Sequence, residues 1–125
     1  MRAVLDTSVV VAEGTTALPD EAAISAATLA ELHFGVHRAR TKDERRRRVR
    51  RLAEVESSFA ALPIDARVAR AYGSLAHMVT EAGAASRRRV MDLLIGATAH
   101  VHGVPLFTRD QGMMVLAPEV DVRLV

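Results

Sequence analysis

The sequence has no cysteine and a single lysine, Lys42. Without cysteine the chain has no disulfide, no zinc–thiolate centre and no thiol nucleophile. A cysteine-free chain is compatible with a reducing compartment, and we expect a cytoplasmic protein. Aromatic residues make up only 3% of the positions, which favours helices packed on a small sheet over an aromatic-rich β-sandwich. No apolar run has the length of a membrane span and the N-terminus lacks a signal-peptide core, so we expect no membrane attachment.

Length and composition predict one folded domain over residues 1–125. Half of the residues are hydrophobic and 26% are charged, a balance that argues against disorder. A chain of this length buries roughly two-thirds of the surface that it exposes when unfolded, so it can carry its own core.

The positive charge is concentrated in two short segments, although the formal net charge is only +2. Between Arg38 and Arg51 nine basic residues stand against two acidic ones, a local charge of +7. A second cluster spans residues 87–89. Arginine-rich segments favour phosphate backbones, but a solvated helix face explains the first segment equally well.

Hydrophobic periodicity predicts an alternation of strands and helices. Strands are expected at 3–5, 22–25, 62–64, 104–107 and 120–125. Helices are expected at 9–12, 28–39, 42–61, 65–82 and 86–102. Asp65 and Ser86 are the expected N-caps of the last two helices, and Gly83 and Gly103 end them. This order predicts a mostly parallel sheet with helices on both faces, whose ligand site lies at the carboxyl ends of the strands.

Two carboxylates stand at that expected position. Asp6 directly follows the first expected strand, and Asp110 follows the fourth, with Thr108 between. Two further acids lie in apolar helices: Glu31 in the second, and Asp92 one to two turns inside the last. Because like charges repel, a cluster of four acids requires a cation, and an all-oxygen donor set favours Mg²⁺ or Mn²⁺ over zinc.

Such a metal site suits phosphodiester cleavage, since the metal activates a water and neutralises charge in the transition state. The hydroxyl residues Thr7, Ser8 and Thr108 stand beside the acids and are expected to hydrogen-bond a carboxylate or a metal-bound water. Each acid also has a purely structural interpretation. These are a helix cap for Asp6, a surface position for Glu31, an ion pair with Arg88 or Arg89 for Asp92, and a turn for Asp110.

Four segments of the chain resemble the signature blocks of PIN domains, and their order and spacing resemble VapC toxins of bacterial toxin–antitoxin modules. These segments are Leu5–Ser8, Ala30–Gly35, Asp92–Ala99 and Leu106–Asp110. The resemblance implies a Rossmann-like three-layer α/β/α sandwich and a Mg²⁺- or Mn²⁺-dependent endoribonuclease. It implies that Asp6, Glu31, Asp92 and Asp110 are the catalytic and metal-binding acids, and that Thr108, with Ser8 and Thr7, supports them.

The resemblance also implies partners: a structured RNA substrate of the tRNA or rRNA class, a VapB-type antitoxin and a second copy in a homodimer. The expected contacts with RNA or antitoxin are Arg45, Arg46, Arg47, Arg48, Arg87, Arg88, Arg89 and Arg109. The chain departs from the family after Asp110, where Gln111 and Gly112 replace a further acid and an aromatic residue. An auxiliary metal ligand from that position is therefore absent.

Two other interpretations compete with a nuclease. A phosphoacceptor receiver domain also uses acids at strand ends, but it needs an acidic pair after the first strand and a lysine after the last core strand, and Lys42 stands elsewhere. A catalytically inactive PIN-fold module that binds RNA or a partner remains the alternative, although the presence of all four acids weighs against it. His33 and His37 have metal-binding spacing, but an exposed helix face explains them better.

Overall fold

The structure is a computed structural model that describes residues 2–12, 18–84 and 89–125. The described residues form a five-stranded parallel sheet of order β3-β2-β1-β4-β5. Its strands are β1 (Arg2–Leu5), β2 (Glu21–Ser25), β3 (Ala60–Leu62), β4 (Leu106–Thr108) and β5 (Val122–Leu124). The expected parallel sheet is confirmed, and β1 is its central strand.

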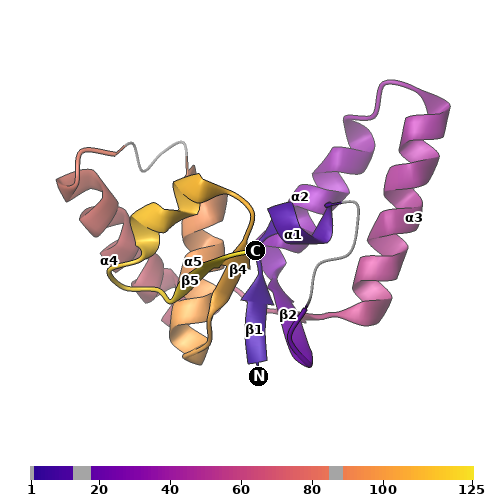
Figure 1. The fold of residues 1–125 in the computed structure, drawn as a ribbon. Coiled ribbons are helices and arrows are strands. Elements are labelled where there is room, and N and C mark those ends of the chain that lie inside the picture. The colour runs from indigo at the N-terminus through magenta and orange to yellow at the C-terminus, as the bar shows by residue number, and fades with distance from the viewer. Residues whose placement is uncertain (1, 13–17, 85–88) are drawn as a thin grey trace.

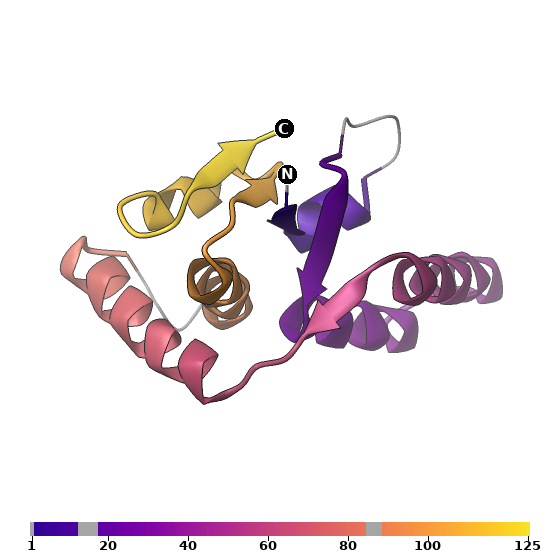
Figure 2. The ribbon, with the colours of Figure 1, turned by 90° about the horizontal axis from the view of Figure 1, so that it is seen from below.

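Helices cover both faces of this sheet, as Figures 1 and 2 show. They are α1 (Thr7–Val10), α2 (Ala26–His37), α3 (Lys42–Ser58), α4 (Ala66–Glu81) and α5 (Val90–His102), with a 3₁₀ segment η2 (Gln111–Leu116). Helices α1, α2 and α3 lie on one side, and α4 and α5 lie on the other. The expected three-layer α/β/α sandwich is confirmed. None of the helices in the described ranges combines the length and apolarity that crossing a bilayer requires.

The central strand is buried on both faces, which is why it reads as a continuous apolar run. Val4 packs into a core with Leu75 of α4 and Leu93 of α5. Leu5 points the other way, into a second core that includes Val55 of α3. The two cores lie on opposite faces of β1 and hold the strand in place. The backbone of Asp6, which follows the strand, is therefore fixed.

Proline shifts two strand boundaries from their expected places. The helix expected to reach residue 61 ends at Ser58, and the third strand occupies Ala60–Leu62 instead of 62–64. Pro63 has no N–H to donate to a ladder, so the strand cannot extend through it. For the same reason the fourth strand begins after Pro105, at Leu106. The strand also ends one residue later than expected, so Thr108 is the last residue of β4 and lies in the sheet.

The caps of α4 and the end of α5 are as expected. The Asp65 carboxylate accepts a hydrogen bond from the Val68 N–H at 3.0 Å, and Gly103 ends α5 with φ of 64°. The expected cap Ser86, with Arg87 and Arg88, lies outside the described residues. Helix α5 is described from Val90, with Arg89 as its N-cap.

This start of α5 corrects the expected depth of Asp92. The side chain lies in the first turn of α5 and not one to two turns inside a longer helix. Backbone N–H groups at a helix N-terminus favour a negative charge. The first turn is therefore a suitable place for a carboxylate that faces other acids.

Candidate active site

The centre of the site is the Asp6 side chain, at the junction between β1 and β4. Its backbone N–H donates to the Phe107 carbonyl at 2.8 Å, which ties the residue to the neighbouring strand. The residue is 4% exposed. Two hydroxyls donate to the same carboxylate oxygen, Oδ2: Ser8 at 2.7 Å and Thr108 at 2.8 Å. Asp6 occupies the N-cap position of α1, as the cap interpretation expects, but within the described residues its side chain makes no capping hydrogen bond. The carboxylate is held by the two hydroxyls instead.

The same two hydroxyls also hold the loop that carries Asp110. The Asp110 N–H donates to Thr108 Oγ1 at 3.0 Å, and the Arg109 N–H donates to Ser8 Oγ at 3.0 Å. Ser8 and Thr108 therefore use both their donor and acceptor capacity. They connect the two strand ends and fix the orientation of the Asp6 carboxylate.

Glu31 reaches the site from the first half of α2. Its Oε1 accepts a hydrogen bond from the Thr7 hydroxyl at 2.7 Å, which joins α2 to α1. The residue is half-buried and lines a surface hollow, so it lies at the surface but its carboxylate is held in place by Thr7. His33, two residues further, points to the exposed side and pairs with Glu56 at 2.8 Å. His37 is also exposed.

Helices α2 and α5, which carry Glu31 and Asp92, are joined by a buried polar contact. The hydroxyl of Ser25, the N-cap of α2, accepts from the Ala27 N–H at 3.0 Å. The Thr98 hydroxyl of α5 lies 3.2 Å from that Ser25 oxygen, and both residues are fully buried. The contact sets the positions of the two helices relative to each other.

The pKa of the Asp92 carboxyl depends on the three other acids. Burial raises the pKa of its carboxyl to about 6, and the neighbouring negative charges of Asp6, Glu31 and Asp110 raise it as well, while Arg89 opposes them. The Arg89 Nη1 atom lies 3.6 Å from Asp92 Oδ2, so the expected ion pair is present. The four acids that the sequence indicated therefore lie close enough to interact electrostatically.

The raised pKa of Asp92 predicts how the stability of the metal-free protein depends on pH. The folded state binds this proton as the pH falls through about 6, whereas the unfolded chain binds it only near its ordinary pKa of about 3.9. Folding is therefore penalised by the charged carboxylate at pH 7.5. The penalty decreases as the pH falls through about 6 and is gone only below about 3.9, where the unfolded chain is protonated as well. Asp92→Asn, which removes the charge at every pH, is expected to melt above wild type at pH 7.5 in EDTA.

Comparison with that variant removes the contribution of every other group, since the two proteins share all of them. The difference in Tm between Asp92→Asn and wild type is expected to stay nearly constant from pH 7.5 to about pH 6.5 and then to shrink progressively toward about pH 4.5. A difference that stays constant over this range would show that Asp92 has an ordinary pKa.

Asp110 lies at the exposed rim of the site. Its Oδ1 accepts a hydrogen bond from the Gly112 N–H at 2.8 Å at the start of η2, so the expected turn role is present. Arg89 Nη1 donates to the Gly112 carbonyl at 3.0 Å. The guanidinium of Arg89 therefore lies beside Asp92 and the turn that follows Asp110. Its expected contact with RNA or antitoxin stays a prediction.

The basic residues of α3 divide between two hollows. Arg48 and Arg51 line one of about 240 Å³ that also contains Thr7 and Glu31. Lys42, Arg45, Arg46 and Arg50 line another. Arg47 and Arg109 are exposed. Arg51 belongs to the basic segment but is not among the expected contacts, because helical periodicity separates the faces of a helix without showing which one lies beside Glu31.

The donor set fits a hard divalent cation. The four acids offer only carboxylate oxygens, and their mutual repulsion, visible in the pKa of Asp92, is relieved by positive charge. In the described part of the chain no three acidic or histidine side chains converge closely enough to hold a metal by themselves. Mg²⁺ in proteins is usually bound by one or two carboxylates and keeps several waters, so an incomplete protein cage suits this ion.

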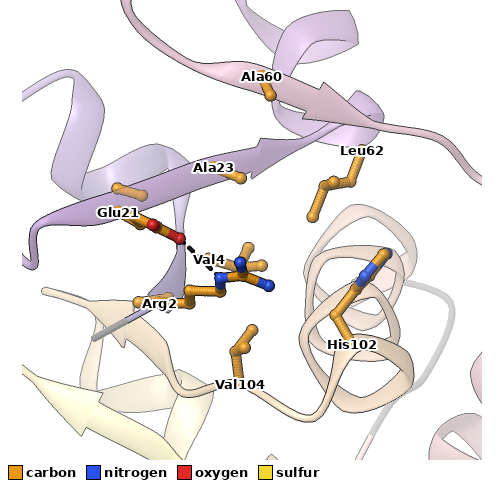
Figure 3. Close-up of a pocket in the computed structure, with 10 residues that line it drawn as sticks. Arg2, Val4, Glu21, Ala23, Ala60, Leu62, His102 and Val104 are labelled. Atoms are coloured by element: carbon orange, nitrogen blue, oxygen red, sulfur yellow. Dashed lines mark hydrogen bonds and ion pairs between the residues drawn. The ribbon is translucent and has the colours of Figure 1, made fainter.

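A separate cavity of about 280 Å³ lies at the amino ends of the strands (Figure 3). Its walls are mainly apolar, with Val4, Leu62 and Val104 among the lining residues. Arg2 and Glu21 form an ion pair of 2.6 Å across it. Because the four acids stand at the carboxyl ends of the strands or on helices beside them, this cavity is not part of their site.

The family model of the PIN domain matches residues 3–117. Over 128 aligned residues the chain is 34% identical to Ribonuclease VapC5 of Mycobacterium tuberculosis, covering 98% of this chain and 93% of that protein. The structure is similar to that of VapBC-5 from Mycobacterium tuberculosis, a member of the VapBC family of toxin–antitoxin systems, with a TM-score of 0.87, 35% identity, and coverage of 99% and 97%. FitAcB from Neisseria gonorrhoeae matches with a TM-score of 0.76, 26% identity, and coverage of 96% and 95%.

Proposed function

The chain belongs to the PIN domain family and to its VapC branch, and from this premise we propose that it is a metal-dependent endoribonuclease toxin. The observation that carries the proposal is the placement of four carboxylates around the carboxyl ends of β1 and β4. Thr108 joins Asp6 to the backbone of Asp110 there, and the other three acids raise the pKa of Asp92. The proposal is supported by the 34% identical relative, whose name is that of a ribonuclease.

In this proposal Asp6, Glu31, Asp92 and Asp110 hold Mg²⁺ or Mn²⁺. The bound metal supplies a water of lowered pKa and neutralises charge on the phosphodiester transition state. Ser8 and Thr108 hold the Asp6 carboxylate in one orientation through its Oδ2 atom. Thr7 does the same for Glu31. These hydroxyls also satisfy the carboxylates when the metal leaves.

The substrate that fits this surface is RNA, and we place its phosphates along the side of α3 that faces the acids. Four carboxylates repel a phosphate backbone, so a nuclease needs cations beside them. Arg48 is fixed there by a hydrogen bond of 2.6 Å to the Gly35 carbonyl and by an ion pair with Glu44. Arg51 lines the same hollow as Glu31. Helix α3 extends beyond the sheet (Figure 1). The class of RNA that we propose, a structured tRNA or rRNA, is the one that the resemblance to VapC toxins implies.

The partners in this proposal are a VapB-type antitoxin and a second copy of the chain in a homodimer, and the protein acts in the cytoplasm. The solved structure of VapBC-5, at 35% identity, supports the antitoxin. Because the site is acidic and its neighbouring hollow is basic, an antitoxin segment carrying both signs of charge suits the same groove that RNA would use.

Arg51→Ala is expected to lower kcat/KM for RNA about tenfold, the loss that follows from one charge-assisted hydrogen bond to phosphate. The slope of log affinity against log salt is expected to fall by about one. Arg50→Ala is the matched control, because Arg50 is its neighbour but lines the other hollow. It is expected to change kcat/KM by less than about twofold. Equal losses in the two variants would contradict a specific role for Arg51.

The proposed activity is tested by incubating the purified protein with end-labelled tRNA and rRNA in Mg²⁺, in Mn²⁺ and in EDTA. Discrete cuts that require the metal are expected. Binding without cleavage under either metal would favour the inactive binding module. If the protein neither binds nor cleaves either RNA class, the proposed substrate is overturned.

A further inference from the structure

Arg89 is a cation held inside the acidic site by contacts on two sides. It is the N-cap residue of α5, and its side chain is 31% exposed. Its Nη1 atom lies 3.6 Å from Asp92 Oδ2 and donates to the Gly112 carbonyl at 3.0 Å. The guanidinium therefore bridges the helix that carries Asp92 and the loop that follows Asp110.

Gly112 leaves the space that the guanidinium occupies. A Cβ atom at Gly112 would lie 2.8 Å from Arg89 Nη2 and 3.0 Å from Asp110 Oδ1. A side chain there would push away either the arginine or the acid. The positive group thus lies 3.6 Å from the Asp92 carboxylate. The Asp110 carboxylate lies on the other side of the space that a Gly112 side chain would fill, where the family resemblance leads one to expect an aromatic residue.

We propose that Arg89 is an internal counter-ion of the site, which competes with the divalent metal for Asp92 and so lowers the metal affinity. This inference rests on the proposed function, since it assumes that the four acids bind a metal. A fixed positive charge a few ångströms from a ligand repels an incoming cation and offsets part of the acids' repulsion when the metal is absent. Arg89 then keeps the metal-free site stable and makes metal binding conditional on a sufficient concentration of the ion.

A purely structural role for Arg89 predicts the opposite sign. If the bridge to Gly112 only anchors the Asp110 loop, then its loss disorders a ligand and weakens metal binding. The two roles are therefore separated by the direction in which metal affinity changes, without any measurement of RNA cleavage.

The experiment is Mn²⁺ titration followed by EPR of the free ion, at low salt and without RNA. Arg89→Met is expected to bind Mn²⁺ about three- to tenfold more tightly than wild type, as one nearby charge at an intermediate effective dielectric implies. Arg89→Lys keeps the charge and is expected to stay within about twofold of wild type. Arg70→Met is the control for net charge, because it removes the same charge as Arg89→Met. Arg70 is an exposed residue of α4 near His100, in the last turn of α5, whereas Asp92 lies in the first turn. This variant is expected to leave the Mn²⁺ affinity unchanged.

Weaker or unchanged Mn²⁺ binding in Arg89→Met overturns the counter-ion role. Unfolding of both Arg89→Met and Arg89→Gln in EDTA overturns it as well, because a residue whose loss unfolds the protein is a structural anchor. Failure of the wild type to bind Mn²⁺ is a different result. It would overturn the proposed function itself and not only the role of Arg89.

Discussion

Asp6→Asn is expected to lower metal-dependent RNA cleavage by at least about 10³-fold, since a metal ligand supports several kcal/mol of transition-state stabilisation. Asp6 is the most buried of the four acids, at 4% exposure, and stands at the junction of the two central strands. The amide of asparagine keeps the size of the side chain but removes the charge that holds a cation. Cleavage is measured with the same labelled RNA in Mg²⁺ and in Mn²⁺.

The fold of Asp6→Asn is expected to be intact. The asparagine keeps one oxygen that can accept from the Ser8 and Thr108 hydroxyls, which now end on Oδ2. The substitution also removes one of the negative charges that raise the pKa of Asp92. The Tm in EDTA at pH 7.5 is therefore expected to equal or exceed that of wild type, so that loss of activity cannot be attributed to unfolding.

Asp43→Asn is the matched control for this variant. Asp43 lies on the exposed start of α3 and pairs with Arg46 at 3.3 Å. Exposed pairs of this kind contribute about 0–1 kcal/mol, so stability and cleavage are both expected to stay close to wild type. Full metal-dependent cleavage by Asp6→Asn beside an unchanged control would falsify the assignment of Asp6 to the site.

The arrangement of Asp6 and Asp110 was predictable because it depends on topology alone. A short apolar run followed by an acid identifies a buried strand and its carboxyl end, and parallel strands bring such ends to one edge. β1 and β4 are hydrogen-bonded neighbours, so the two acids meet as expected. The expected order of strands and helices along the chain is also that of the structure.

The environment of Arg89 was not predictable in the same way. A run of three arginines reads as a solvated or phosphate-binding surface, because sequence shows charge but not the backbone carbonyl that a side chain reaches. The contact depends on Gly112, which is 23 residues further along the chain and comes close only in the folded structure. That Arg50 and Arg51 line different hollows was not predictable either. The orientation of α3 is set in the folded structure by the packing of Val55 against the sheet.

Thr108→Val is expected to lower both stability and cleavage, because the hydroxyl serves two parts of the site. Thr108 is fully buried, donates to Asp6 Oδ2 at 2.8 Å and accepts from the Asp110 N–H at 3.0 Å. Valine has the same shape but replaces the hydroxyl by a methyl group, which leaves the Asp110 N–H without this acceptor. An unsatisfied group of this kind costs about 1–3 kcal/mol, so the free energy of unfolding in urea is expected to fall by that amount.

Cleavage by Thr108→Val is expected to fall about 10- to 100-fold, the usual effect of removing a group that orients a metal ligand. Thr108→Ser keeps the hydroxyl and is expected to restore most of the activity. Val79→Ala is the control for stability alone, because Val79 is a fully buried residue of α4, a helix that carries none of the four acids. It is expected to lose about 2 kcal/mol of stability, the cost of two buried methyl groups, with little loss of cleavage. If Val79→Ala and Thr108→Val lose cleavage in proportion to stability alone, then Thr108 acts only as a packing residue. A larger loss in Thr108→Val at equal stability means that the hydroxyl positions Asp6 and Asp110 for the metal.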